Sequence, residues 1–384
     1  MAGHGARSIL RAVTAFALRR PFLILRDLVT SRERPDLERL SRVSDPEGFV
    51  WAILPHAART FSACIAMMPA RSALPSAVAY LYCRMLDTYE DLVPDAATRE
   101  SSLRAFAARL TAADGRPEAR RLRPAPPIHT ASDRDERDRA HLLLVRKAEL
   151  VDTVFLTFDE QTRAVVRDLV RDMAEGMCWS SSTFSAQHGV LRDEQQLSTY
   201  CRHVLGNPAV FGIRLLKLEH GQSPELSDAE HEDAMLVGEM VQLANVTRDI
   251  EKDLRRGIAY HASLSGDVGH DVTTESDPEL LERIRAARER MLRFALARAE
   301  SYHRIISAVR LPRWSLGRGS AVLMLLFTER YFRGCARRVG MRVWPGPDSV
   351  ITLLRRTVAA TFSRKRAFQE MERVEREFLA AAIS

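Results

Sequence analysis

The chain has 384 residues, of which 46% are apolar, so it can bury one large core or two ordinary ones. Its net charge of +7 comes from 57 basic and 50 acidic residues, and arginine far outnumbers lysine. A basic surface favours anionic partners, but no nucleic-acid-binding module or repeated basic-aromatic pattern accompanies the charge, which argues against a nucleic-acid-binding protein.

The first predicted element is a basic leader, residues 1–45. Arginines interrupt its apolar run, which makes it a poor signal peptide. Two interpretations are open: the leader lies on a membrane surface with Phe16, Phe22, Leu23 and Leu25 inward, or it packs on the rest of the protein as a first helix. No apolar run in the chain reaches the roughly 20 residues that span a bilayer. The five cysteines are odd in number and form no paired spacing, so we expect a cytoplasmic protein, peripheral to the membrane under the first interpretation.

Beyond the leader, apolar residues recur at three- and four-residue spacing, which predicts an all-α protein. We expect one helical domain over residues 46–384. Within it, residues 112–140 are rich in Pro, Arg and Asp and predict a flexible surface insertion. Further helices are expected over residues 143–182, 194–220, 227–256, 277–309, 315–339 and 349–381.

A polar stripe runs along the apolar segment "AVAYLYCRMLDTYEDL". Tyr80, Arg84, Asp87 and Asp91 follow at spacings of four, three and four, so they share one helix face, with Glu90 beside them. A solvated face would carry charges over half the circumference, with acids paired to bases at i,i+4. This pattern instead predicts a helix inside the protein whose polar stripe faces a cavity.

A second stripe occupies "VGEMVQLANVTRDIEKDLRRG". Gln242, Asn245, Asp249 and Asp253 are spaced three, four and four, and Arg248 adds a base next to the acid. One such stripe could be a structural feature held by a buried arginine. Two of them favour a shared site.

Crowded carboxylates in an apolar setting have raised pKa values unless a cation neutralises them. Oxygen ligands suit Mg²⁺, which shares its shell with substrate phosphates, whereas no His pair or Cys cluster near the stripes indicates zinc or redox iron. The five scattered cysteines are predicted to be reduced core residues. An apolar cavity around this site fits a hydrocarbon diphosphate, and ionisation of an allylic diphosphate is chemistry that needs such surroundings.

The motifs together resemble the squalene/phytoene synthase family. The resemblance covers about residues 50–262. It rests on "YLYCRMLDTYED" (80–91) and "GEMVQLANVTRDIEKD" (238–253) as the two aspartate-rich motifs, with "EGMCW" (175–179) and "YCRHVLG" (200–206) between them and "ARTF" (58–61) where the family has S-x-S-F.

The resemblance implies a single isoprenoid synthase-type helical domain around a central active-site cavity. It also implies residue roles. The metal ligands would be Asp87, Glu90, Asp91, Asn245, Asp249 and Asp253. The contacts to diphosphate would be Arg59, Thr60, Arg84, Gln242, Asn245 and Arg248. Tyr80 and Tyr200 would stabilise the departing group or the carbocation, and Tyr331 either reaches the cavity or serves packing.

The implied reaction is the Mg²⁺-dependent head-to-head condensation of two prenyl diphosphates, with farnesyl diphosphate favoured, to a squalene-, dehydrosqualene- or phytoene-type product. NADPH would be needed only for squalene. Departures from the family pattern at Ala58, "HVLG" and "GIAYHA" keep open a terpene synthase that cyclises a single prenyl diphosphate. A catalytically idle lipid-binding or assembly factor is the non-enzyme alternative.

Overall fold

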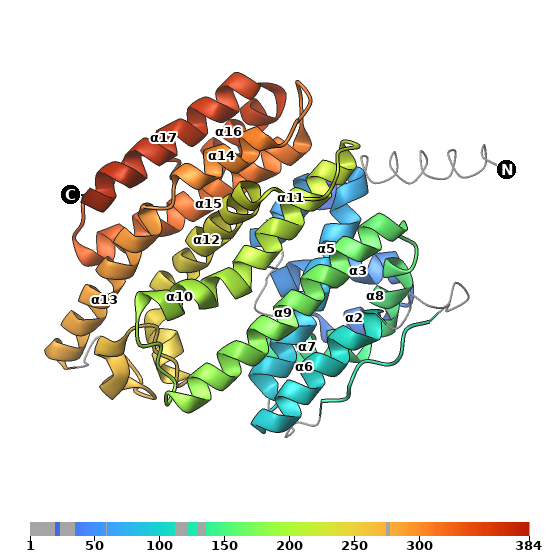
Figure 1. Cartoon of the computed structure of the whole chain (residues 1–384), viewed down its shortest axis with the longest axis horizontal. Coiled ribbons are helices and arrows are strands. Elements are labelled where there is room, and N and C mark those ends of the chain that lie inside the picture. The colour runs from blue at the N-terminus through green and yellow to red at the C-terminus, as the bar shows by residue number, and fades with distance from the viewer. Residues whose placement is uncertain are drawn as a thin grey trace. The chain divides into compact units, whose positions relative to one another are not determined.

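The computed structural model describes residues 20–23, 35–58, 60–111, 121–128, 136–273 and 277–383. In these ranges the secondary structure is helical, and β-type pairing is confined to one isolated parallel bridge between Val190 and Ala259. The prediction of an all-α protein is confirmed (Figure 1). The five cysteines are free and buried, as predicted.

The chain forms two compact units. The first comprises residues 1–174, 215–223 and 315–320, and the second comprises residues 175–214, 224–314 and 321–384. The helices that begin in the first unit, apart from α15, are α2 (Leu37–Arg42), α3 (Pro46–Ala58), α4 (Thr60–Met67), α5 (Ala70–Leu92), α6 (Ala96–Thr111), α7 (Glu136–Arg146), α8 (Ala148–Phe155) and α9 (Glu160–Ala186). Helix α5 packs against α3, α4, α6, α7 and α8, so most of its surface is buried.

A buried ion pair joins α6 to α8 in the first unit. The Arg109 guanidinium donates two hydrogen bonds of 2.8 Å to Asp152, and the Tyr82 hydroxyl of α5 donates a third at 2.9 Å. Arg109 also donates to the carbonyl of Arg123, at 3.0 Å. This network ties three helices to a non-helical segment.

That segment, residues 121–128, lies within the predicted flexible insertion. The Tyr89 hydroxyl donates to the carbonyl of Pro126 at 2.6 Å, which gives the segment a second anchor on α5. Helix α6 ends at Thr111 and α7 begins at Glu136, while residues 112–120 and 129–135 lie outside the described residues. The described part of the insertion is therefore held against the first unit.

The described part of the leader packs on the protein. Arg20 donates to the carbonyl of Met68 at 2.9 Å, and Leu23 is buried. Phe22 is 68% exposed, whereas Phe16 and Leu25 lie outside the described residues. Leu23 thus faces protein, contrary to the membrane-facing expectation. Among the described helices, we find none that combines the length and apolarity needed to cross a bilayer.

The second unit is built around one long helix, α12 (Asp228–Arg255). Its other elements are α10 (Glu194–Cys201), the π-helical turn η1 (Arg202–Gly206), α11 (Asn207–Glu219), η2 (Ala262–Asp267), α13 (Pro278–Leu296), α14 (Glu300–Ala308), α15 (Leu316–Val339), α16 (Val350–Phe362) and α17 (Arg364–Ile383). The division between the units falls inside α9, α11 and α15. A capping box begins α12, because Ser227 and Glu230 each accept a hydrogen bond from the other's backbone N–H.

Helix α12 touches η1 through glycines. A Cβ atom added to Gly238 would lie 2.1 Å from the carbonyl oxygen of Leu205, and one added to Gly206 would lie 2.6 Å from Sδ of Met235. Only glycine permits so close an approach of two backbones. The first residue of the motif "GEMVQLANVTRDIEKD" therefore fixes α12 against the turn formed by "RHVLG".

We predict that Gly238→Ala lowers the free energy of unfolding by about 2 kcal/mol or more, because η1 and α12 must move apart. The matched control is Gly212→Ala in α11, where an added Cβ meets no atom within 4 Å. Urea denaturation should leave this control unchanged or slightly stabilised, since alanine favours a helix over glycine. Equal stability of both variants would refute the close approach.

Candidate active site

The first acidic stripe is the open face of an otherwise buried helix. From Pro75 to Leu92, α5 buries every residue except Tyr80, Arg84, Asp87, Glu90 and Asp91. These five are the residues that sequence spacing placed on one face. Spacing alone therefore identified the polar face of α5 correctly.

Three side chains of this stripe are joined. Arg84 donates from Nη2 to the Tyr80 hydroxyl at 3.1 Å, and its Nη1 lies 2.9 Å from Oδ2 of Asp87. Burial raises the pKa of the Asp87 carboxyl, and the opposing charge of Arg84 does not cancel the rise. The Nε of Arg84 is buried and has no hydrogen-bond partner in the described structure. Asp91 is exposed and makes no ion pair with the described residues.

The second stripe lies on the C-terminal half of α12. Asn245 donates to Oε1 of the buried Gln242 at 3.2 Å. The Arg248 guanidinium donates two hydrogen bonds to the Asp249 carboxylate, of 2.8 and 2.7 Å. The Arg248 guanidinium also lies 4.7 Å from the centre of the Tyr331 ring, a cation–π distance. Tyr331 thus positions a predicted site residue, a role that its sequence context left open.

Helix α12 is kinked at Asp249, whose φ of −104° and ψ of 16° are not helical. Two arginines donate to the carbonyls just before the kink: Arg288 to Thr247 at 2.8 Å and Arg338 to Arg248 at 3.3 Å. Side chains that enter the carbonyl ladder of a helix are a recognised cause of kinks. The kink turns the backbone at the residue predicted to bind metal.

Two tyrosines lie beside the end of this stripe. Tyr260 lies close enough to Asp253 to lower the pKa of its carboxyl slightly, and the Tyr260 hydroxyl lies 3.4 Å from the hydroxyl of Tyr200. Burial, and then the charge of Asp249, raise the pKa of Asp253 to about 6. The structure therefore brings the predicted Tyr200 to the second motif through Tyr260, which sequence reasoning missed. The sequence feature that could have indicated Tyr260 is its position just after the second motif, in "GIAYHA".

A pair of loops holds Tyr260 in place. The N–H of Ala259 donates to the carbonyl of Gly189 at 2.8 Å, and the N–H of Leu191 donates to Ala259 at 2.9 Å. Gly189 has a φ of +84°, and a Cβ there would lie 2.0 Å from the carbonyl oxygen of Gly257. Glycine is required at that position, and the bridge fixes the backbone next to Tyr260.

The residues of each stripe fit a hard divalent cation. Their side-chain oxygens are the ligands that Mg²⁺ prefers, and the raised pKa values of Asp87 and Asp253 mark places where a cation would be stabilising. In the described parts of the chain, however, no three His, Cys, Asp or Glu side chains gather closely enough to hold a metal ion. The two stripes belong to different units, and their joint ligand set stays a prediction.

Two predicted substrate-binding residues are not placed. Arg59 lies outside the described residues, and Thr60 is described only as the first residue of α4. Phe61, next in the "ARTF" segment, has its ring centre 5.9 Å from that of Tyr80. The segment therefore reaches the start of the first stripe through an aromatic contact.

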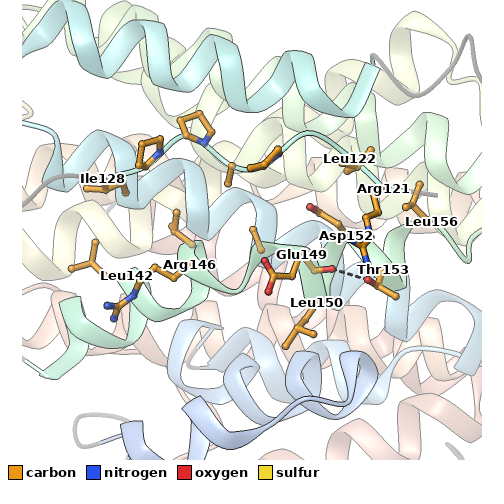
Figure 2. A pocket seen from close by; sticks show the side chains of 16 residues that line it. Arg121, Leu122, Ile128, Leu142, Arg146, Glu149, Leu150, Asp152, Thr153 and Leu156 are labelled. Carbon is orange, nitrogen blue, oxygen red and sulfur yellow. Dashed lines mark hydrogen bonds between the residues drawn. The ribbon is translucent and has the colours of Figure 1, made fainter. Parts of the chain in front are cut away.

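A pocket of about 920 Å³ lies in the first unit, between residues 121–128 and helices α7 and α8 (Figure 2). Its wall includes Asp152, whose charge is already matched by Arg109, and Glu149, whose carbonyl accepts from the Thr153 hydroxyl at 2.8 Å. None of the predicted site residues lines it. This pocket is therefore separate from the first acidic stripe.

We predict that Asp253 makes stability depend on pH. Its folded pKa of about 6 exceeds the ordinary value of about 3.9, so its protonated form stabilises the fold below pH ~4, and that stabilisation is lost as pH rises through ~6. Because the carboxyl is partly solvated, we expect a loss of only about 1–2 kcal/mol. In chemical denaturation at several pH values, Asp253→Asn should remove this slope. Glu372→Gln, at an exposed position, should retain it.

Comparison with known proteins bears on the same region. The family profile described as squalene/phytoene synthase matches residues 54–338, which include all the predicted site residues. Two curated relatives come from Botryococcus braunii. The lycopaoctaene synthase is 27% identical over 70% of this chain and 57% of its own length. The squalene synthase BSS is 27% identical over 55% of this chain and 41% of its own length. The chain thus spans about half the length of the curated relatives it matches.

Solved structures share the fold. Complexes of TcSQS with the ligands BPH1237 and E5700 each superpose with a TM-score of 0.61 at 14% identity, over 88% of this chain and 99% and 98% of theirs. At that identity the likeness concerns the fold alone. The profile match is the stronger finding, because it covers well over half of the chain and both acidic stripes. The chain belongs to the squalene/phytoene synthase family.

Proposed function

We propose that this protein is a prenyltransferase that joins two prenyl diphosphates head-to-head, with Mg²⁺ as its metal and farnesyl diphosphate as the favoured substrate. The observation that carries the proposal is the open face of α5. In a helix buried everywhere else between residues 75 and 92, it offers one arginine, one tyrosine and three acids. The family match over residues 54–338 supports this chemistry for both stripes.

In this proposal five acids and the Asn245 amide hold the metal. Asp87, Glu90 and Asp91 would do so on α5, and Asn245, Asp249 and Asp253 on α12. When bound, Mg²⁺ supplies charge that offsets the negative charge developing on the leaving diphosphate. The raised pKa values of Asp87 and Asp253 support the assignment, since buried carboxylates of this kind gain most from a nearby cation.

The basic and amide side chains of the stripes would bind the diphosphate. Arg84 has a buried Nε without a partner, which leaves a hydrogen-bond donor for an anion. Arg248, Gln242, Arg59 and Thr60 complete the proposed set. Bidentate geometry suits arginine to phosphate oxygens.

The tyrosines would act on the reacting carbons. Tyr80 accepts from Arg84, so its hydroxyl is oriented at the first stripe. Tyr200 and Tyr260 form an aromatic pair, with ring centres 5.3 Å apart, beside Asp253. Aromatic faces stabilise a carbocation by cation–π attraction and exclude the water that would quench it.

The proposal also covers where the protein is located in the cell and which reductant it uses. We infer a cytoplasmic protein, with peripheral membrane contact through the basic leader, where Phe22 is exposed. NADPH would serve as reductant if the product is squalene.

The deciding experiment is product analysis. The purified protein is incubated with Mg²⁺ and farnesyl or geranylgeranyl diphosphate, with and without NADPH. A hydrocarbon of twice the substrate's length supports the proposal, and a saturated central bond that requires NADPH identifies squalene. A cyclic hydrocarbon of the substrate's own length would establish the terpene synthase alternative. Absence of diphosphate release with every substrate would favour the idle lipid-binding or assembly factor.

We predict that Asp91→Asn and Asp253→Asn each lower kcat/KM by at least about 100-fold, because each removes charge from a proposed metal ligand. Neither acid has an ion-pair partner in the described structure, so both variants should fold with unchanged or higher stability. Turnover is measured by diphosphate release, and stability by thermal melting. The exposed Glu372→Gln serves as control. Near-normal turnover in both variants would refute the assignment.

A further inference from the structure

Helix α16 has an outer face that is apolar and exposed. Ile351 is 79% exposed, Val358 51% and Phe362 67%. Spacings of seven and four place these three side chains on one side of the helix. The opposite side buries Leu353 and Thr357, each 1% exposed. An ordinary surface helix is polar on its outer side, so this face lacks a partner in the described structure.

The partner of α16 within the unit is α17. The two helices lie side by side in Figure 1, and they contact each other. The ion pair between Arg356 and Glu370, at 2.6 Å, joins them. That contact uses the inner side of α16 and leaves Ile351, Val358 and Phe362 free of it.

The surroundings of this face are basic. Residues 349–369 contain five basic residues and no acid, and the acids at either end of this stretch, Asp348 and Glu370, are each paired with arginines. Arg355, Arg364, Lys365 and Arg366 are exposed, and Ser363 alone separates the two helices at the basic corner. An apolar stripe bordered by cations is complementary to a surface that presents negative charge over hydrocarbon.

We propose that the outer face of α16 with its basic corner docks on a bilayer containing anionic lipids. Ile351, Val358 and Phe362 enter the boundary between headgroups and acyl chains, and Arg355 with residues 364–366 contacts lipid phosphates. This surface is distinct from the leader. Its role does not depend on the proposed chemistry, although a protein that handles prenyl chains would gain access to them there.

The test is sedimentation of the full chain with phosphatidylcholine vesicles, with and without phosphatidylglycerol. We expect binding that requires phosphatidylglycerol and weakens as salt is added, since screening shortens the reach of surface charge. The double variant Ile351→Ser/Phe362→Ser should bind at least about tenfold more weakly. The triple variant Arg364→Gln/Lys365→Gln/Arg366→Gln should lose about fivefold for each charge removed.

The matched control is Leu281→Ser on α13, a leucine that is 37% exposed in the same unit. It should bind as the unaltered chain does, and all variants should keep their melting temperature because the changed side chains are exposed. Every variant retains the leader, so a difference in binding reports α16. Undiminished vesicle binding by the double variant would overturn the proposal. A second result would also overturn it: the unaltered chain does not bind vesicles but forms a dimer in sedimentation velocity, and the double variant is monomeric.

Discussion

The pairing of buried carboxylates with arginine stabilises the interior of each of the two units. Asp152 is gripped by Arg109 in the first unit, and in the second the fully buried Glu239 lies 3.2 Å from Arg202 and 2.7 Å from Arg298. Removing one partner of such a pair costs about 3–5 kcal/mol, because a charge is left unmatched in an apolar interior. All but four basic residues are arginine, whose planar fork suits this pairing. Part of the excess of arginine over lysine is therefore explained by arginines that pair with buried carboxylates.

Two acids of the stripes, Asp91 and Asp253, differ from the buried acids Asp152 and Glu239. Glu239 and Asp152 have their counter-ions within the protein. Asp91 is exposed and Asp253 half-buried, and neither makes an ion pair with the described residues, although Lys252 and Arg256 lie near enough to Asp253 to lower the pKa of its carboxyl. A partly buried acid without an ion pair, such as Asp253, is costly to keep charged, and acids with pKa values raised in this way cluster at functional sites. The missing charge is what a site for a cation provides.

Periodicity predicted the stripes because the residues of one helix face recur every three or four positions in the sequence. Features that depend on tertiary packing produce no such periodic pattern. The break between α13 and α14 falls at Ala297–Ala299, and the one between α16 and α17 at Ser363, without any Gly or Pro, so each pair was expected as one helix. The kink at Asp249 follows two carbonyls that accept hydrogen bonds from Arg288 and Arg338, which are distant in sequence. Tyr260 lies near Asp253 in a loop whose backbone is bridged to another loop at Ala259.

The pairing of Arg248 with Asp249 bears on how a ligand can bind. A diphosphate that took Arg248 alone would cost Asp249 the two hydrogen bonds that it accepts from Arg248, and a cation that took Asp249 alone would cost the guanidinium the same two bonds. Each event by itself breaks an ion pair between two partly buried charges, which is costly. When cation and anion arrive together, both side chains exchange one partner for another. Arg84 and Asp87 form a comparable pair, so the ligand that we propose, a metal ion together with a diphosphate, would offer each charge of both pairs a new partner.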